Sequence, residues 1–396
     1  MSDNPERWRN PPPPLRGAER GSWAHKSIVE RLPEIGRRTL AQNDFPLAVR
    51  SRIEELIEEI PRGQIHPIRD PGAPDAESWE RYVAPHEGSD WLQPPWFFVE
   101  TYFYRRIVAA CGYFQADIIR PSDPFRYEKS RGLEDAPAVA ESALRHDDLA
   151  SQLLAALWGN QADLSLWPDG HSDRPNAEST GSDRILRDDR DRVLDHLATV
   201  PDVNRIDILL DNAGAELAAD LSLTDNLLRS FPGAELYLHA KAHPTFVSDA
   251  TVFDVEQTLH TLRESAATDV AAMAGRLQRA LADGRLRLRA PLFWTSPLPA
   301  WELPAELMNE LAASNLLISK GDANYRRLLG DRHWTPTAPI AEILSYLPTS
   351  AAALRTLKSD VVAGLNERSV HRAEQADPDW MINGRWAAVQ FAHSGS

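Results

Sequence analysis

Carboxylate and amide side chains follow two apolar segments of this chain, at the points where those segments end. The run at 206–210 leads directly into Asp211 and Asn212, and Asp249 stands beyond the run at 234–239. Carboxylate and amide oxygens are hard ligands, and Mg²⁺ and Mn²⁺ prefer such ligands. The two junctions therefore predict a divalent-metal site that handles an anionic substrate.

A purely structural role for the same acids is also open. Asp is a common helix cap, and both Asp211 and Asp249 precede segments with a helical pattern, at 213–230 and 253–283. Glu216 follows Asp211 within the first of these segments. Spacing alone leaves the metal-ligand and helix-cap interpretations open.

A third junction contains Gly321 and Asp322. Gly allows a tight turn or the close approach of a ligand, and Asp322 is placed to cap a helix. Because helix N-termini also favour anions, a cap and a ligand site are compatible here. The same helix would carry Asn324, Tyr325 and Arg326.

Two cations, Arg355 and Lys358, lie in the segment 350–364, which we expect to be a helix that ends at Gly364. Their spacing would place both side chains on one helical face, where they could clamp a phosphate. Charged residues on a helix face are more often simply solvated. Surface charge is therefore the simpler interpretation of this pair.

Short apolar runs alternate with helical segments after about residue 200, and this alternation indicates how the polar groups are positioned. It predicts an α/β layer fold with a mostly parallel sheet. In such sheets, ligand sites gather at the carboxyl ends of the strands. The expected strands are 206–210, 234–239, 286–290 and 315–319, and the expected helices are 213–230, 253–283, 302–313 and 350–364.

The first part of the chain has helical signals and no strong strand pattern. Ile53, Leu56, Ile57 and Ile60 recur at the spacing of one helical face. The charged run at 188–192 is most simply a solvated helix face. The predicted organisation is an extended Pro-rich arm at 1–26, a helical region at 27–185 with a loop at 168–184, and a metal-binding catalytic α/β domain at 186–396.

Composition excludes several classes of protein. The 396-residue chain has a net charge of −15, which disfavours general binding to nucleic acid. Its single cysteine, Cys111, excludes an internal disulfide and fits a reducing cytoplasm. No segment reaches the roughly 20 apolar residues that a membrane helix needs, and no secretory signal is visible. We expect a cytoplasmic protein that does not bind membranes.

Several common motifs are absent from the sequence. It has no Gly-x-x-x-x-Gly-Lys-Ser/Thr phosphate loop, no Gly-x-Ser-x-Gly elbow and no Gly-x-Gly-x-x-Gly after a strand. The last absence gives no support to a dinucleotide or adenosyl-cofactor site. Zinc is weakly supported, because no His-Glu-x-x-His motif exists.

Taken in order, the motifs resemble those of the damage-control phosphatase family, also called acidic-residue methyltransferase-like. The subfamily with an Arg-Thr-x-Lys motif is the most similar, and this chain has Arg355-Thr356-Leu357-Lys358. The other matching stretches are 96–106, 158–165, Phe293-Trp294 and 320–326, with Gly330-Asp331 and Trp334.

The resemblance implies a helical N-terminal region packed on a C-terminal three-layer α/β/α sandwich. It implies a divalent metal, Mn, Mg, Co or Ni, held by Asp211, Asn212 and Asp249. The implied activity is hydrolysis of small phosphometabolites, sugar phosphates for this subfamily. It implies substrate contacts from Glu216, from the loop 322–326 with Asn324, Tyr325 and Arg326, and from Lys358, and we expect Arg355 to balance charge beside them.

We therefore predict a metal-dependent phosphatase for sugar phosphates such as fructose 1-phosphate or fructose 6-phosphate, with Asp211, Asp249 and Asp322 as catalytic acids. A second hypothesis is methyl transfer to protein carboxylates from S-adenosylmethionine, which saturable binding of that cofactor would support. A third is a non-enzymatic binding module that recruits a partner through the arm. Protein partners are unknown.

Overall fold

The computed structural model describes residues 7–115, 123–159 and 181–394. Most of the predicted loop at 168–184 and the first residues of the predicted arm lie outside these ranges. Within the described residues, no helix is both long and apolar enough to cross a membrane.

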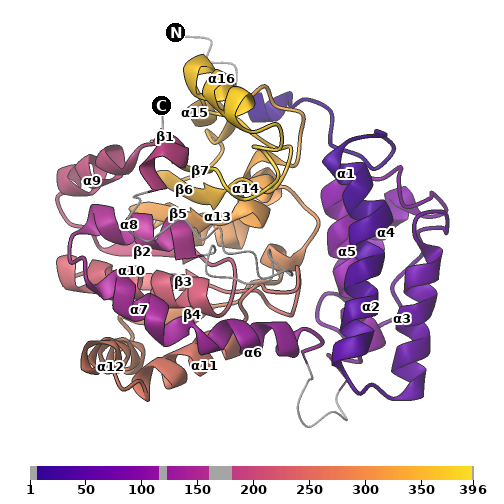
Figure 1. Cartoon of the computed structure of the whole chain (residues 1–396), viewed down its shortest axis with the longest axis horizontal. Coiled ribbons are helices and arrows are strands. Elements are labelled where there is room, and N and C mark those ends of the chain that lie inside the picture. Colours follow the sequence, from indigo (N-terminus) through magenta and orange to yellow (C-terminus); the bar gives the residue numbers. More distant parts are fainter. Residues whose placement is uncertain (1–6, 116–122, 160–180, 395–396) are drawn as a thin grey trace.

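A seven-stranded sheet forms the centre of the molecule (Figure 1). Every neighbouring pair of strands is parallel except β6 and β7, which are antiparallel. The prediction of an α/β fold with a mostly parallel sheet is therefore confirmed. In the order β1-β7-β6-β5-β2-β3-β4, the strands are Ile185–Asp188, Ala387–Ala392, Ala351–Thr356, Leu316–Lys320, Arg205–Leu209, Glu235–His239 and Leu286–Arg289.

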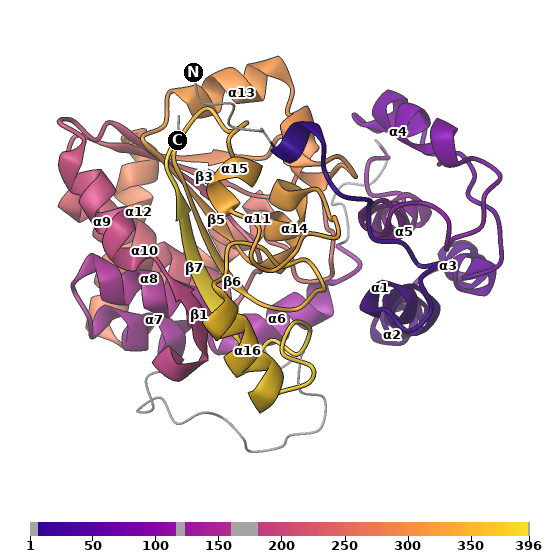
Figure 2. The ribbon, with the colours of Figure 1, turned by 90° about the horizontal axis from the view of Figure 1, so that it is seen from above.

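Each face of the sheet carries its own apolar core. Along β5, Leu317 belongs to the core shared with the N-terminal helices, whereas Ile318 belongs to the core on the opposite face. This division follows from the two-residue period of a strand, and a sheet covered on both faces needs apolar residues at nearly every position. The predicted α/β/α sandwich is thus confirmed, as Figure 2 shows.

The helices fall into two groups. The first group stands beside the sandwich (Figures 1 and 2) and comprises α1 (Trp23–Lys26), α2 (Leu32–Gln42), α3 (Leu47–Glu59), α4 (Ala76–Val83) and α5 (Trp96–Ala110). The second belongs to the sandwich and comprises α6 (Arg126–Glu134), α7 (Ala136–Leu144), α8 (Leu149–Trp158), α9 (Arg190–Thr199), α10 (Ala215–Ser230), α11 (Val252–Arg263), α12 (Thr268–Ala282), α13 (Ala305–Ala312), α14 (Asp322–Leu329), α15 (Ile340–Ile343) and α16 (Glu367–Ala376).

Helices α7 and α8 pack directly on α10, across the predicted boundary between the 27–185 and 186–396 regions. The helical prediction for the first part of the chain is right. The domain boundaries themselves stay a prediction.

The predicted helix at 350–364 is wrong. Residues Ala351–Thr356 form the buried strand β6, so Arg355 and Lys358 do not share a helical face. The error has a physical origin: the run Ala351-Ala352-Ala353-Leu354 is apolar on both faces, as a central strand requires, but alanine and leucine are also strong helix formers.

Other differences are smaller. The expected helix at 253–283 is two helices, α11 and α12, and strands β1 and β7 were not expected. The charged run at 188–192 is not wholly solvated, since Asp189 is buried and accepts a hydrogen bond from the backbone N–H of Phe391 at 3.0 Å. This bond ties the start of α9 to β7.

The described part of the arm is built into the structure. Pro14 forms a bridge with Arg332, and the N–H of Leu15 donates to the carbonyl of Asp331 at 3.1 Å. The carbonyl of Leu15 in turn accepts from the N–H of Trp96, at the start of α5. The arm therefore runs between α5 and the end of α14.

A buried guanidinium joins the same two helices. Arg326 on α14 lies 2.6 Å from a Glu100 oxygen on α5 and 2.8 Å from an Asp331 oxygen, and its guanidinium lies 3.6 Å from the centre of the Trp96 ring. Nε and Nη1 of the predicted substrate contact Arg326 thus hold the N-terminal helices to the sandwich, while its Nη2 has no hydrogen-bond partner among the described residues.

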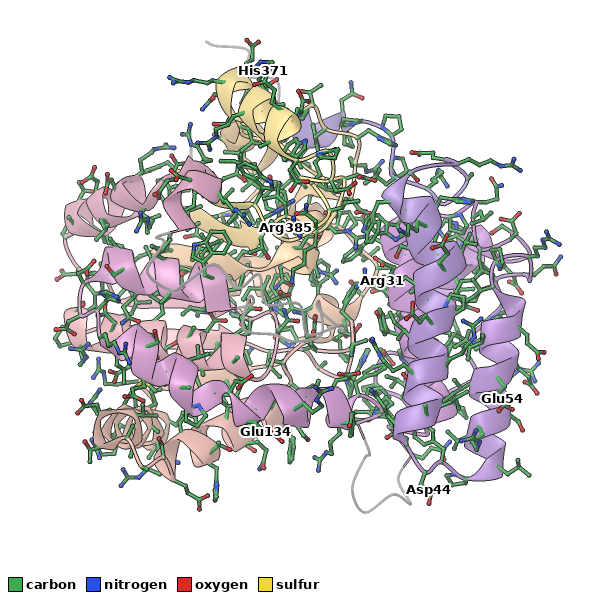
Figure 3. All side chains as sticks on the ribbon, viewed as in Figure 1. Arg31, Asp44, Glu54, Glu134, His371 and Arg385 are labelled. Atoms are coloured by element: carbon green, nitrogen blue, oxygen red, sulfur yellow. The ribbon has the colours of Figure 1, made fainter. Side chains whose placement is uncertain are left out.

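We expect Glu100→Gln to lower the free energy of unfolding by about 2 kcal/mol, because it removes the charge that faces a buried Arg326. Urea unfolding measures the change. The matched control is Glu54→Gln on α3 (Figure 3), where the carboxylate is 52% exposed and lies 3.9 Å from Arg50. That surface pair should change stability by under about 0.5 kcal/mol, and equal effects of the two variants would contradict the role of Arg326.

Candidate active site

Three neighbouring strands, β5, β2 and β3, carry the predicted site at their carboxyl ends. Asp211 and Asn212 follow β2, Asp249 lies in the loop after β3, and Asp322 opens α14 after β5. The loops after β2 and β3 are joined by a bridge between Asn212 and Asp249, in which the N–H of Ala250 donates to the carbonyl of Asp211 at 2.7 Å. The structure therefore brings the three predicted metal ligands together.

Neither Asp211 nor Asp249 caps a helix. Helix α10 begins at Ala215 after Gly214, with no side-chain cap, and α11 is capped by the hydroxyl of Thr251. The helix-cap alternative thus falls away. Both carboxylates are buried, and neither is used at a helix N-terminus.

Burial and mutual repulsion dominate the electrostatics of this pair. Burial raises the pKa of Asp211 well above its ordinary value, and the charges of Glu216 and Asp249 raise it further. Burial also raises the pKa of Asp249, against the opposing effect of Lys241. Such a pair is stabilised by any cation that can enter between the acids.

Lys241 supplies part of the needed positive charge. Its ammonium lies 3.0 Å from Oδ2 of Asp249, donates to the carbonyl of Leu210 at 2.9 Å and donates to Oδ1 of Asn324 at 3.2 Å. The ion pair with Asp249 has poor hydrogen-bond direction, and Oδ2 has no properly aligned donor in the described residues. This oxygen keeps its capacity to bind a further cation.

The amide of Asn212 has a defined orientation. Its Nδ2 donates to Oδ2 of Asp211 at 3.0 Å and to Oε2 of Glu216 at 2.8 Å, while Ser248 donates its hydroxyl to the amide oxygen. The two acidic neighbours hold the N–H₂ group, so the oxygen is directed away from them.

These residues fit a hard divalent cation. Among the described residues, no group of three or more His, Cys, Asp and Glu is arranged to hold a metal ion. The candidate donors here are instead two carboxylates and one amide. All three are oxygen donors, which suit Mg²⁺ or Mn²⁺ better than a soft metal. The buried acids of Asp211 and Asp249 supply the negative charge.

Gly321 lets β5 pass close to Asp211. Its φ is +80°, and a Cβ placed on it would lie 1.8 Å from Oδ2 of Asp211. Only glycine accepts both this backbone conformation and this approach. The sequence predicts a tight turn or a close approach at Gly321. In the structure, the group that approaches Gly321 closely is the side chain of Asp211.

Asp322 and the Arg-Thr-x-Lys motif lie together at the next position along the sheet edge. An Asp322 oxygen lies 3.2 Å from a guanidinium nitrogen of Arg355 and accepts from the backbone N–H of Lys358 at 3.3 Å. Lys358 is half-buried, and its charge acts on the pKa of Asp211. Lys358 is therefore a cation that can face an anionic ligand.

The remaining predicted contacts support their neighbours. Arg355 is buried, donates to the carbonyl of Val361 at 2.7 Å and lies 4.0 Å from the centre of the Tyr325 ring. Asn324 donates to the carbonyls of Leu210 and Lys320, at 2.9 and 2.8 Å. Their side chains order the two loops beside the metal-ligand residues.

Two lysines at this edge were not among the predicted site residues. Lys241 lies two residues beyond the end of β3 and Lys320 ends β5, so both lie at the carboxyl ends of central strands. A lysine at such a buried position is a signal by itself, because a buried ammonium needs an anionic partner.

Comparison with known proteins identifies relatives of this chain. The family Damage-control phosphatase ARMT1-like domain matches residues 27–372. Damage-control phosphatase ARMT1 of Xenopus laevis is 31% identical in an alignment of 445 residues, gaps included. The alignment covers 97% of this chain and 100% of the relative. The protein of the same name from Danio rerio is 29% identical over 438 residues, 96% and 97% of the two chains.

The chain belongs to the ARMT1-like family of damage-control phosphatases. The predicted family is confirmed, and with it the enzyme class, a phosphatase. A solved DUF89 family protein from Pyrococcus horikoshii has a TM-score of 0.49 and 17% identity, over 86% of this chain and 95% of its own. That likeness is too low to carry any conclusion.

In this damage-control phosphatase, Gly321→Ala should abolish activity, because the added methyl group displaces Asp211. Phosphate release from a sugar phosphate measures the loss, which we expect to exceed about 100-fold. Gly88→Ala is the matched control: Gly88 has a similar φ of +81° but nothing within 4 Å of an added Cβ. Similar losses in both variants would point to backbone strain alone.

The loop that carries Asp249 places His243 against the start of α4. This histidine is buried, its Nε2 lies 3.7 Å from an oxygen of Asp75, and Asp75 is bound by Arg105. Burial lowers the pKa of His243 from 6.5 to about 4, and the charges of Arg105 and Lys129 act in the same direction while Asp75 opposes them. The folded protein therefore holds this imidazole neutral.

We expect the protein to lose stability as the pH falls from about 6.5 towards 4, because the unfolded chain binds a proton at His243 that the folded chain does not. The pKa difference corresponds to about 3 kcal/mol. Urea unfolding of the parent and of His243→Gln across this pH range measures the effect. An equally steep pH dependence in the variant would contradict the assignment.

Proposed function

We propose that this phosphatase hydrolyses small phosphorylated metabolites with the help of a divalent metal held by Asp211, Asn212 and Asp249. The observation that carries the proposal is the pair of buried, mutually repelling carboxylates at the junction of β2 and β3, with an amide oxygen beside them. Such a pair is costly in the absence of a cation. Mn²⁺, Mg²⁺, Co²⁺ and Ni²⁺ are the candidate metals.

When bound, the metal would polarise the phosphoryl group and lower the pKa of a bound water. The chain's own residues supply the rest. Lys358 balances charge on the phosphate oxygens, and Asp322 holds the backbone of Lys358 in place. In the hydrolysis, a water oxygen forms a bond to phosphorus, the bond from phosphorus to the sugar oxygen breaks, and a proton returns to that oxygen.

We assign the predicted site residues to this reaction as follows. Asp211 and Asp249 hold the metal, and Asp249 or Asp322 orients the attacking water. Lys358 lines the substrate side, whereas both oxygens of the predicted contact Glu216 are already bound, to Lys320 and Asn212. Arg355, Asn324, Tyr325 and Arg326 act through the loops that they order, since their side chains already bind other groups of the protein.

The substrates we propose are sugar phosphates such as fructose 1-phosphate and fructose 6-phosphate. The Arg-Thr-x-Lys motif at 355–358 supports them through its resemblance to one subfamily, and its Lys358 is the half-buried cation beside Asp211. We place the enzyme in the cytoplasm, where the single cysteine would stay reduced.

Asp211→Ala should lower phosphate release from both sugar phosphates by at least about 1000-fold, because it removes a charged metal ligand. The assay uses each candidate metal in turn. Asp195→Asn, an exposed acid on α9, serves as the control and should keep full activity. Turnover by Asp211→Ala at saturating metal would contradict the metal assignment. Phosphate release only from other phosphate esters would contradict the substrate assignment.

A further inference from the structure

Lys320 ends β5 beside the site, and its ammonium is shared between two acids of α10. Its Nζ lies 3.0 Å from Oε1 of Glu216 and 2.8 Å from Oδ1 of Asp220, and each of the three side chains is at most 2% exposed. In the part of the chain that the structure describes, Asp220 has no other ion-pair partner. Each of these buried charges therefore depends on the other two.

Glu216 connects Lys320 to the predicted metal ligand Asn212. While Oε1 faces the ammonium of Lys320, Oε2 accepts a hydrogen bond from Nδ2 of Asn212 at 2.8 Å. The N–H₂ group of Asn212 is thereby fixed between Glu216 and Asp211, and the amide oxygen is fixed on the other side, next to Ser248. An unbroken chain of contacts thus leads from Asp220 to the amide of Asn212.

We propose that Lys320 is a positioning residue, which holds Glu216 so that Glu216 presents the amide oxygen of Asn212 to a divalent cation. This inference rests on the metal site of the proposed function. The ammonium of Lys320 also lies 2.8 Å from Asp220, one helical turn from Glu216 on α10, where neither Asp220 oxygen has a well-aligned donor among the described residues. Burial raises the pKa of Asp220 to about 7, and Lys320 opposes that rise.

The sign of an effect on metal affinity separates this role from simple electrostatics. Removing a nearby cation should by itself strengthen the binding of another cation, because like charges repel. If Lys320 positions Glu216, removing it should instead weaken metal binding, because Asn212 loses its fixed orientation. Groups that orient metal ligands typically contribute 10–100-fold in affinity.

The test is calorimetric titration of the full chain with Mn²⁺, without substrate. Lys320→Met should raise the Kd for Mn²⁺ by about tenfold or more. Glu216→Gln should have a comparable effect, and the double variant should bind no more weakly than the weaker single variant. Lys26→Met, the same change at an exposed position on α1, should leave the Kd unchanged.

Unchanged or tighter binding of Mn²⁺ by Lys320→Met would overturn the inference, as would additive effects in the double variant. Lys320→Met leaves Asp220 without a partner, so Lys320→Met/Asp220→Leu, which removes both buried charges, provides a second form of the test. It should show the same weakening, and parental affinity in it would also overturn the inference. A parent protein that takes up no Mn²⁺ would overturn the proposed metal site itself.

Discussion

The structure depends on one constraint: several acids are buried at the carboxyl edge of a single sheet, where water cannot screen them. Every buried carboxylate there must meet a cation or an N–H group, and the chain is already strongly acidic overall. Four buried carboxylates lie beside two buried ammonium groups, and burial raises the pKa of Asp211, Asp220 and Asp249. The acids are Asp211, Glu216, Asp220 and Asp249, and the ammonium groups belong to Lys241 and Lys320.

The N-terminal helices contribute to this arrangement from outside the sandwich. Arg326 ties α14 to α5, and the buried His243 packs the loop of Asp249 against the start of α4. The Arg326 connection is buried and polar, so it specifies one relative placement more sharply than apolar packing alone would. The helices thus fix the loops that hold the acids, although they supply none of the proposed metal ligands.

Much of this could be predicted from sequence, for reasons specific to particular segments. The strands at 206–210, 234–239 and 315–319 are short apolar runs flanked by polar turns, and such runs are readily recognised. Because their carboxyl ends meet at one edge, the grouping of Asp211, Asn212 and Asp249 followed from the alternation of strands and helices. The family resemblance added the catalytic class, which local pattern did not contain.

What could not be predicted depends on contacts between distant residues. Strand β6 resembles a helix locally, and only pairing with β5 and β7 makes its alanine-rich run a strand. Arginine is a residue type that often binds phosphate. Nη1 of Arg326 instead donates to Glu100, more than two hundred residues earlier in the chain. Nothing in the local sequence of Lys320 reveals that it faces two acids of α10.

The position of β7 has a consequence for how the chain completes its fold during synthesis. In the part of the chain that the structure describes, strand β1 pairs with β7 alone, and β7 is the last of the seven strands to be synthesised. Asp189 likewise meets its backbone partner at Phe391 only then. Strand β1 therefore cannot join the sheet before β7 has formed, and until then β1 and the free side of β6 are exposed strand edges of the kind that invites pairing with other chains.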